Sequence, residues 1–210
     1  MSTDLNAPTR HDLLDGAADV DMHLAALDVV LDALRCEAEH LRSWGCELAH
    51  RALAGHRLLA AGNGGSAAEA QHLTAELVGR FDGDRRPFAA VALHADTSAV
   101  TAIGNDYGFD EVYARQVQAH ARPGDVVVLL STSGRSPNLL RAAEAARAVG
   151  ATTWALTGAA PNPLAGAVDD CIALPGPSAN VQEAQLVAVH TLCRAFDATV
   201  RRSEARGGAA

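Results

Sequence analysis

The apolar run VVVLL at residues 126–130 is the feature that most restricts how this chain can fold. A strand with one face in water alternates apolar and polar residues, whereas this run does not alternate, so both of its faces must be covered. Comparable short segments recur between helical stretches, and we expect five strands, at Arg57–Ala61, Phe88–Leu93, Val126–Leu130, Thr152–Leu156 and Cys171–Leu174. This alternation predicts an α/β fold with a doubly wound, mainly parallel five-stranded sheet flanked by helices.

Helical periodicity accounts for most of the remaining chain. Residues 12–54 are helical in character, and they contain one apolar stripe at spacings of three and four, formed by Leu24, Leu27, Val30, Leu31 and Leu34. This stripe needs a partner, so the N-terminal helices either cover the sheet or pack against another subunit. Further helices are expected at about 66–79, 109–120, 137–149 and 181–202. We expect a flexible arm at residues 1–11, a single domain at 12–202 and a disordered tail at 203–210.

The chain contains no lysine, since all 17 basic residues are arginine, and 25 acidic residues bring the net charge to −8. Without an amine on a flexible stem, Schiff-base chemistry and the lysine of a Walker-type phosphate loop are excluded. Arginine keeps its proton at working pH, so proton transfer must fall to carboxylates or to the nine histidines. The acidic balance also argues against a nucleic-acid partner.

Targeting signals and cysteine patterns point to the cytoplasm. No apolar stretch reaches the roughly 18 residues that a membrane span requires, so no membrane partner is expected. The N-terminal sequence MSTDLNAPTR lacks the basic and apolar regions of a signal peptide. The cysteines, Cys36, Cys46, Cys171 and Cys193, show no CxxC spacing. We therefore expect four free, largely buried thiols rather than a disulfide framework or a zinc knuckle.

Two predicted strands are followed by loops that suit an anion. Residues 62–66, GNGGS, lead into a helix whose N-terminal N–H groups favour negative charge, although a merely tight turn would look the same. Residues 131–136, STSGRS, carry four hydroxyls, and Ser136 before Pro137 is also a good N-cap. No dinucleotide or nucleoside triphosphate motif is present. Because ligands of open α/β sheets bind at the carboxyl ends of strands, we expect an anionic small molecule here.

Polar residues on two predicted helices add candidates for chemistry. His72 and Glu76 lie on one helix face at a spacing of four, where they could hold a divalent metal, transfer protons, or form a solvated surface pair. On the last helix, Gln182 and His190 are about 12 Å apart along the axis. Two side chains this far apart could bind the same ion only with strain, unless the helix end bends or neighbouring subunits contribute. Taken alone, His190 would more often be an ordinary core histidine whose hydrogen bonds are satisfied.

Two weaker signals concern a helix start and a loop. Asn180 and Glu183 resemble a capping box, which places the start of the last helix close to Gln182. Residues 101–108 have the composition of a loop. Within it, Asn105 and Asp106 could accept hydrogen bonds from sugar hydroxyls, or they could be plain turn residues.

Taken together, these segments resemble the sugar isomerase (SIS) domain family, and within it the phosphoheptose isomerases. The resemblance is carried by GNGGSAAEAQHLTAEL, TAIGNDYGFDEVYARQV, LLSTSGRSPNLLRAAEAARAVGA, ALTG and VQEAQLVAVH, within residues 20–198. It implies the SIS fold, with N-terminal helices used in oligomerisation, and a homotetramer with active sites at subunit interfaces. It also implies an isomerase that converts D-sedoheptulose 7-phosphate to D-glycero-D-manno-heptose 7-phosphate through a metal-assisted enediol mechanism, in nucleotide-activated heptose biosynthesis.

The resemblance also implies roles for individual residues. One Zn²⁺ per subunit would be held by His72, Glu76, Gln182 and His190. Glu76 and His190 would be catalytic, with Glu76 moving the proton between C1 and C2 and His190 serving the oxygens. The substrate would be bound by Asn63, Gly64, Gly65, Ser66, Glu76, Asn105, Asp106, Ser131, Thr132, Ser133, Ser136 and Gln182.

Departures from the family pattern leave the assigned residues in place. Arg135 stands where the family usually has Asn, and its guanidinium could contact phosphate or point to solvent. Glu69 replaces a common Asp. Two other functions are compatible with the resemblance. Some relatives bind the bacterial replication initiator as tetramers without a known isomerisation, but the complete set of four zinc-binding residues favours the enzyme. An isomerase of another sugar phosphate is the second, because phosphate loops do not read the distal sugar.

Overall fold

The structure, a computed structural model, describes the backbone of residues 10–207 and the side chains of residues 19–206. Its helices are α1 (Arg10–Cys36), α2 (Ala38–Leu53), α3 (Gly65–Val78), α4 (Thr97–Tyr107), α5 (Ala114–His120), α6 (Pro137–Ala148) and α7 (Ser178–Gly207), with a short 3₁₀ helix, η1 (Phe109–Glu111). Its strands are β1 (Leu58–Gly62), β2 (Ala90–Ala92), β3 (Val126–Ser131), β4 (Thr152–Thr157) and β5 (Asp170–Ala173).

The five strands form one sheet in the order β2-β1-β3-β4-β5, and every pairing is parallel. This confirms the predicted doubly wound α/β fold, with a sheet that is wholly rather than mainly parallel. The central strand β3 is buried along its entire length, as its unbroken apolar run predicts. The winding reverses between the neighbouring strands β1 and β3, which is the place where open α/β sheets bind ligands.

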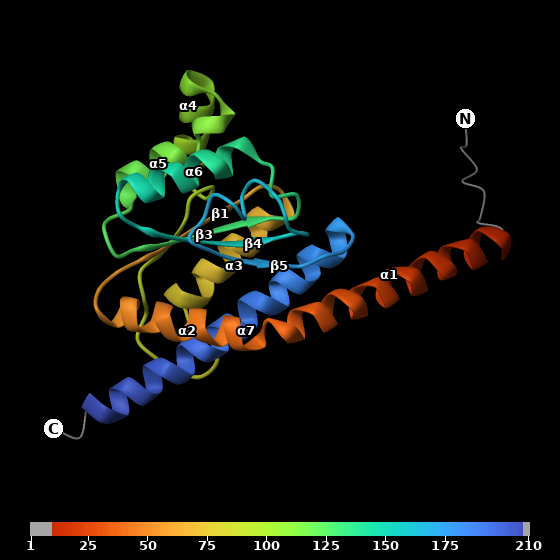
Figure 1. Ribbon diagram of the computed structural model, residues 1–210, viewed down its shortest axis with the longest axis horizontal. Coiled ribbons are helices and arrows are strands. Elements are labelled where there is room, and N and C mark those ends of the chain that lie inside the picture. Colours follow the sequence, from red (N-terminus) through yellow and green to blue (C-terminus); the bar gives the residue numbers. More distant parts are fainter. Residues whose placement is uncertain (1–9, 208–210) are drawn as a thin grey trace, which may run out of the picture.

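Helices cover both faces of the sheet (Figure 1). One face packs against α2, α3 and α7 in a core that includes Trp44, Trp154 and Phe196. The rings of Trp44 and Trp154 stack with their centroids 4.8 Å apart. The other face packs against α5 and α6 in a core built mainly from Ala, Val and Leu. Residues 109–120, expected as one helix, are divided between η1 and α5.

The N-terminal helix α1 is only partly packed within one chain. Its C-terminal end buries Val30 and Leu34 against the core, whereas Val20 and Leu24 are 58% and 54% exposed. Figure 1 shows the rest of the helix projecting away from the body of the molecule. The helix begins at Arg10, inside the predicted arm, and α7 continues to Gly207, beyond the predicted boundary at 202. The remainder of the predicted arm and tail lies outside the described residues.

The prediction of a loop at residues 101–108 is wrong, because most of this segment belongs to helix α4. The helix is started by Asp96, whose carboxylate accepts a hydrogen bond from the Ala99 N–H at 3.0 Å, as an N-cap does. No residue of α4 is buried. The apolar stripe that reveals most helices in a sequence is therefore missing here.

The predicted capping box at Asn180 is also wrong. Helix α7 begins at Ser178, so Asn180 lies inside its first turn. The Asn180 amide donates to the backbone carbonyl of His23 on α1 at 3.1 Å and to the Glu183 carboxylate at 3.0 Å. Its role is thus to join α1 to α7 rather than to start a helix.

The four cysteines are free, as predicted, but they differ in burial. Cys193 is buried, Cys46 and Cys171 are half-buried, and Cys36 is exposed, so the expectation of burial is wrong for Cys36. Within the described part of the chain, no helix is both long enough and apolar enough to cross a membrane.

Candidate functional site

Two predicted loops meet at the point where the winding of the sheet reverses. Residues 62–66 follow β1 and residues 131–136 follow β3, and these two strands are hydrogen-bonded neighbours. Between the loops lies a pocket of about 130 Å³, lined by Asn63, Ser66, Leu130, Ser131, Thr132, Ser133, Ser136 and Gln182. The structure therefore brings together most of the residues predicted to hold an anion. The pocket is small and polar, which suits a phosphate group more than a nucleotide.

The glycines of the first loop are required by geometry. Gly64 has a φ of +57°, a conformation that side chains disfavour. A Cβ on Gly62 would collide with the backbone carbonyl of Ser66, and one on Gly65 would lie 2.5 Å from the Gln182 side-chain oxygen. These close approaches let the start of α3 pack against both the end of β1 and the beginning of α7.

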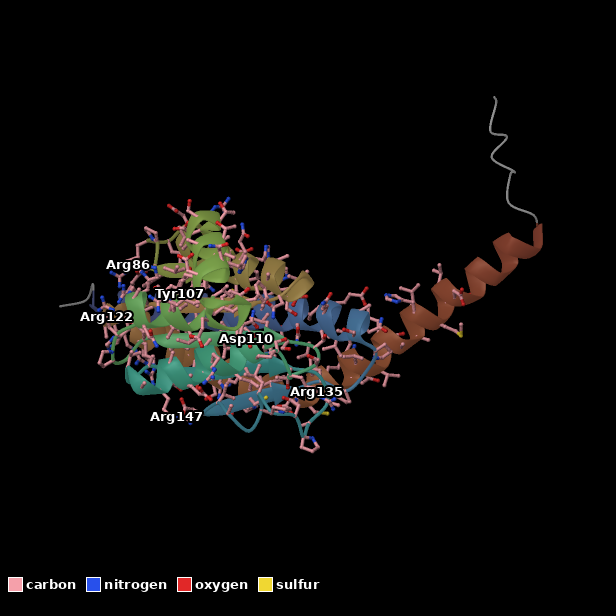
Figure 2. The ribbon with its side chains drawn as sticks, turned by 90° about the horizontal axis from the view of Figure 1, so that it is seen from above. Arg86, Tyr107, Asp110, Arg122, Arg135 and Arg147 are labelled. Carbon is pink, nitrogen blue, oxygen red and sulfur yellow. The ribbon has the colours of Figure 1, made fainter. Side chains whose placement is uncertain are left out.

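The second loop is held by hydrogen bonds of its own. The Gly134 N–H donates to the Ser131 hydroxyl at 3.0 Å, and the Ser178 hydroxyl at the start of α7 donates to the Thr132 hydroxyl at 2.7 Å. Ser136 occupies the N-cap position of α6 but makes no side-chain capping bond, so its hydroxyl stays available to a ligand. Arg135 points to the outside of the molecule (Figure 2), the second of the two orientations considered for it.

A buried polar brace connects the two loops. The side-chain amides of Asn63 and Asn138 exchange two hydrogen bonds, at 3.0 and 2.9 Å. The Tyr113 hydroxyl donates to the Gly62 carbonyl at 2.5 Å, and burial raises the pKa of this phenol. Asn138 and Tyr113 are 1% and 3% exposed, so the brace lies behind the pocket. Neither residue was predicted from the sequence, because nothing local marks partners that are 75 and 51 residues away.

A group of side chains that could ligate a metal lies along α3 and α7. His72 Nε2 is 3.0 Å from Glu76 Oε1 and 2.8 Å from His190 Nε2. Ligand atoms of these three residues all lie within 4.8 Å of one another. Two imidazoles and a carboxylate are a donor set that zinc prefers. The predicted grouping of His72, Glu76 and His190 is therefore present within one chain.

Other predicted site residues lie apart from this group. Gln182 packs against Gly65 at the start of α3, about 10 Å along that helix from His72. Asn105 and Asp106 are exposed on α4, where the Asn105 amide donates to the Asp106 carboxylate at 2.8 Å. Gln182 as a fourth metal ligand, and Asn105 and Asp106 as substrate contacts, stay predictions.

Glu69 is a buried carboxyl on the same face of α3 as His72 and Glu76. It is 9% exposed, and its Oε2 has no hydrogen-bond partner among the described residues. Burial raises the pKa of this group from 4.5 to about 7. From the sequence Glu69 is only an exchange for Asp, because its burial cannot be seen in a helix start rich in small residues.

The sequence pattern of the SIS domain matches residues 23–158, a range that contains both loops and the His72–Glu76 pair. The chain belongs to the SIS domain family. The phosphoheptose isomerase of Streptomyces coelicolor is 62% identical over 183 residues, 87% of this chain and 79% of the relative. That of Shewanella sediminis is 41% identical over 184 residues, 86% of this chain and 93% of the relative.

Solved structures agree with this relationship. The phosphoheptose isomerase of Neisseria gonorrhoeae superposes with a TM-score of 0.77 at 38% identity, covering 89% of this chain and 98% of that structure. That of Francisella tularensis gives a TM-score of 0.72 at 34% identity, covering 85% of this chain and 98% of that structure. The expected fold, family resemblance and enzyme class, an isomerase, are confirmed.

Proposed function

We propose that this protein is an aldose–ketose isomerase that converts D-sedoheptulose 7-phosphate to D-glycero-D-manno-heptose 7-phosphate, in the biosynthesis of activated heptose. The observation that carries this proposal is a pocket lined by hydroxyls at the N-terminal end of α3, with the His72–Glu76–His190 group farther along the same helix. The names of relatives up to 62% identical support the choice of a seven-carbon sugar. A cytoplasmic location fits, because a charged sugar phosphate does not cross a bilayer unaided.

The substrate phosphate would occupy the pocket between the two loops. Hydroxyls of Ser131, Thr132, Ser133 and Ser136 and N–H groups at the start of α6 supply donors without a lysine. The N-terminal end of a helix adds a positive partial charge at the same place. With the phosphate held there, the far end of an extended sugar would be directed toward α3 and α7.

The donor set on α3 and α7 fits zinc, since imidazole and carboxylate atoms already converge within 4.8 Å. His72, Glu76 and His190 would hold the ion, with Gln182 as the predicted fourth ligand. When bound, zinc would supply Lewis acidity that polarises the sugar carbonyl. The protein residues perform the remaining steps.

Proton transfer would be divided between Glu76 and His190. The Glu76 carboxylate would take the proton from C1 of the open-chain ketose, which leaves an enediol, and would return it to C2. His190 would take the proton from the C1 oxygen and give one to the C2 oxygen as the carbonyl moves. Both groups are half-buried, so water competes less for these protons.

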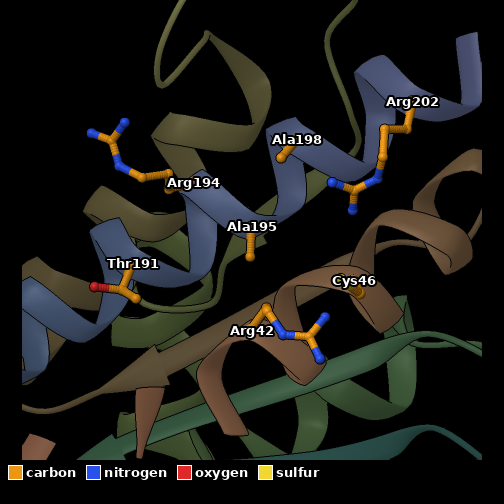
Figure 3. Close-up of a pocket in the computed structure, with 7 residues that line it drawn as sticks. All are labelled: Arg42, Cys46, Thr191, Arg194, Ala195, Ala198 and Arg202. Atoms are coloured by element: carbon orange, nitrogen blue, oxygen red, sulfur yellow. The ribbon is translucent and has the colours of Figure 1, made fainter. Parts of the chain in front are cut away.

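We further propose a homotetramer in which neighbouring subunits complete each site. This is supported by the exposure of Val20 and Leu24 on the projecting part of α1, since a monomer seldom leaves large apolar side chains on one helix in water. A second surface that a neighbouring subunit could cover is a groove of about 320 Å³ between α2 and α7, lined by Arg42, Arg194 and Arg202 (Figure 3). A neighbour would also explain why Gln182 and Asn105 lie apart from the metal-ligating group within one chain.

The test is turnover of sedoheptulose 7-phosphate by the wild-type protein and by Glu76→Gln. We expect a loss of at least about 100-fold in kcat, the lower range for removing a general base. Glu144→Gln, which neutralises an exposed carboxylate on α6, is the matched control and should keep full turnover. Near wild-type turnover by Glu76→Gln would refute the role of Glu76. Zinc content and turnover both absent from the wild type would favour the non-catalytic regulator, and faster turnover of another ketose phosphate would correct the substrate.

A further inference from the structure

Arg85 carries a buried charge near the proposed metal site, and no part of the proposed mechanism uses it. It lies in the segment that joins α3 to β2, and its side chain is only 4% exposed. Arginine is seldom buried unless its charge is paired. The partner is Asp197 on α7, which is 2% exposed and accepts a hydrogen bond from Arg85 Nε at 2.7 Å.

Both terminal nitrogens of the guanidinium bind the end of α3, and Nη1 also donates to the Arg86 carbonyl at 3.0 Å. Nη2 donates to the carbonyl of Glu76 at 2.6 Å, and Nη1 donates to that of Leu77 at 3.1 Å. Carbonyls in the last turn of a helix have no partner within the helix and carry its negative partial charge, so a buried cation satisfies both needs. The rings of Phe88 and Phe196 lie 5.4 and 5.5 Å from the guanidinium carbon.

These contacts connect the two helices that carry the metal-ligating group. Glu76 supplies both a candidate ligand and one of the bound carbonyls. Asp197 is seven residues after His190, about two turns along the same face of α7. Its second oxygen accepts from the Asp82 N–H at 3.2 Å, which fixes the carboxylate as well.

We propose that Arg85 is a positioning residue, which sets the distance between Glu76 and His190 by clamping the last turn of α3 to α7. The inference rests on the proposed function. The clamp requires the planar fork of arginine, because one ammonium cannot reach the carboxylate and two carbonyls in the same geometry. A change at Arg85 should therefore act on metal affinity and kcat rather than on substrate binding, since the phosphate pocket lies at the opposite end of α3.

The test uses Arg85→Lys in the full-length protein, with Arg86→Lys as the matched control. Arg86 is the adjacent arginine, half-exposed, and it also lies over the Phe88 ring. We expect Arg85→Lys to lower Co²⁺ affinity by about 10- to 100-fold, as changes around metal ligands do, and to lower kcat with KM within about threefold of wild type. Arg86→Lys should leave Co²⁺ affinity, kcat and KM unchanged.

A second variant separates positioning from folding. Arg85→Met/Asp197→Leu replaces the ion pair with apolar side chains of similar volume, a change that buried pairs often tolerate. If Arg85→Lys does not fold, this double variant carries the same expectations. Wild-type Co²⁺ affinity and kcat in either folded variant would overturn the inference.

Failure of the proposed function gives a different result. A wild-type protein that neither binds Co²⁺ nor isomerises the sugar would refute that function without testing the clamp. The clamp is then tested by a crystal structure of the double variant. A changed separation between Glu76 and His190 would support the inference, and an unchanged separation would overturn it.

Discussion

Replacing Glu69 with Gln should make the protein more stable at neutral and alkaline pH, with the gain building up between about pH 4.5 and pH 7. In the folded protein the pKa of Glu69 is raised by burial to about 7, against 4.5 for the free side chain. The folded state therefore holds a proton that the unfolded chain has already released between these pH values. The contribution of protonated Glu69 to stability is present below about pH 4.5 and is lost as the pH rises to about 7. Glutamine is neutral throughout and loses nothing over this range.

The size of the effect follows from the shift. At 1.36 kcal/mol for each pKa unit, a change from 4.5 to about 7 corresponds to roughly 3 kcal/mol in a dry site. Only one of the two Glu69 oxygens is both buried and without a partner, so we expect about 2 kcal/mol. For a chain of 210 residues this corresponds to about 4–8 °C in melting temperature.

The assay is thermal unfolding of wild type and Glu69→Gln between pH 5 and pH 8, at one fixed protein concentration because assembly shifts melting temperatures. The variant should melt within about 2 °C of wild type at pH 5 and about 4–8 °C higher at pH 8. Glu144→Gln controls for the loss of one surface charge. Parallel curves for Glu69→Gln and wild type across the whole range would refute the reasoning.

Three other predictions concern the pocket, the metal and the assembly. Asn138→Ala removes the acceptor of the half-buried Asn63 side-chain NH2 and one of the donors to its oxygen, so it should raise KM for the sugar phosphate about tenfold in steady-state assays and lower the melting temperature. An unchanged KM would contradict the brace. Dialysis against a chelator should abolish turnover and Zn²⁺ should restore it, whereas turnover unaffected by the chelator would remove zinc from the mechanism. Leu24→Asp, on the exposed stripe of α1, should shift the species seen by light scattering toward smaller assemblies, and Asp28→Asn on the same helix should not; an unaltered mass for Leu24→Asp would place the interface elsewhere.

Sequence patterns predicted the sheet well, because each buried strand is a short apolar run with a turn on either side. The five strands are all present within about two residues of their expected ends. Helix α4 escaped prediction because periodicity detects a buried face, and α4 buries no residue. The capping signal at Asn180 misled for a related reason. Its amide makes a contact with α1. Asparagine occurs both in such tertiary contacts and at helix starts, so the residue type alone does not distinguish the two.

The candidate site was predicted in part. Spacing within α3 placed His72 and Glu76 together, and the meeting of β1 with β3 joined the two loops. The residues that support these groups could not be found in this way. Asn138, Tyr113 and Arg85 act through partners far along the chain, and their roles depend on side-chain direction and burial rather than on local pattern.

The Asn63–Asn138 brace has a consequence for how substrate affinity depends on acidity. Both amides, and the hydroxyls that line the pocket, keep one ionisation state from mildly acidic to mildly alkaline solution. A phosphate monoester, by contrast, loses its second proton near pH 6. A bend near that value would therefore not come from the amides and hydroxyls of the pocket, which present a fixed set of donors, and the Glu69→Gln variant would separate ionisation of the ligand from that of Glu69, whose pKa is about 7.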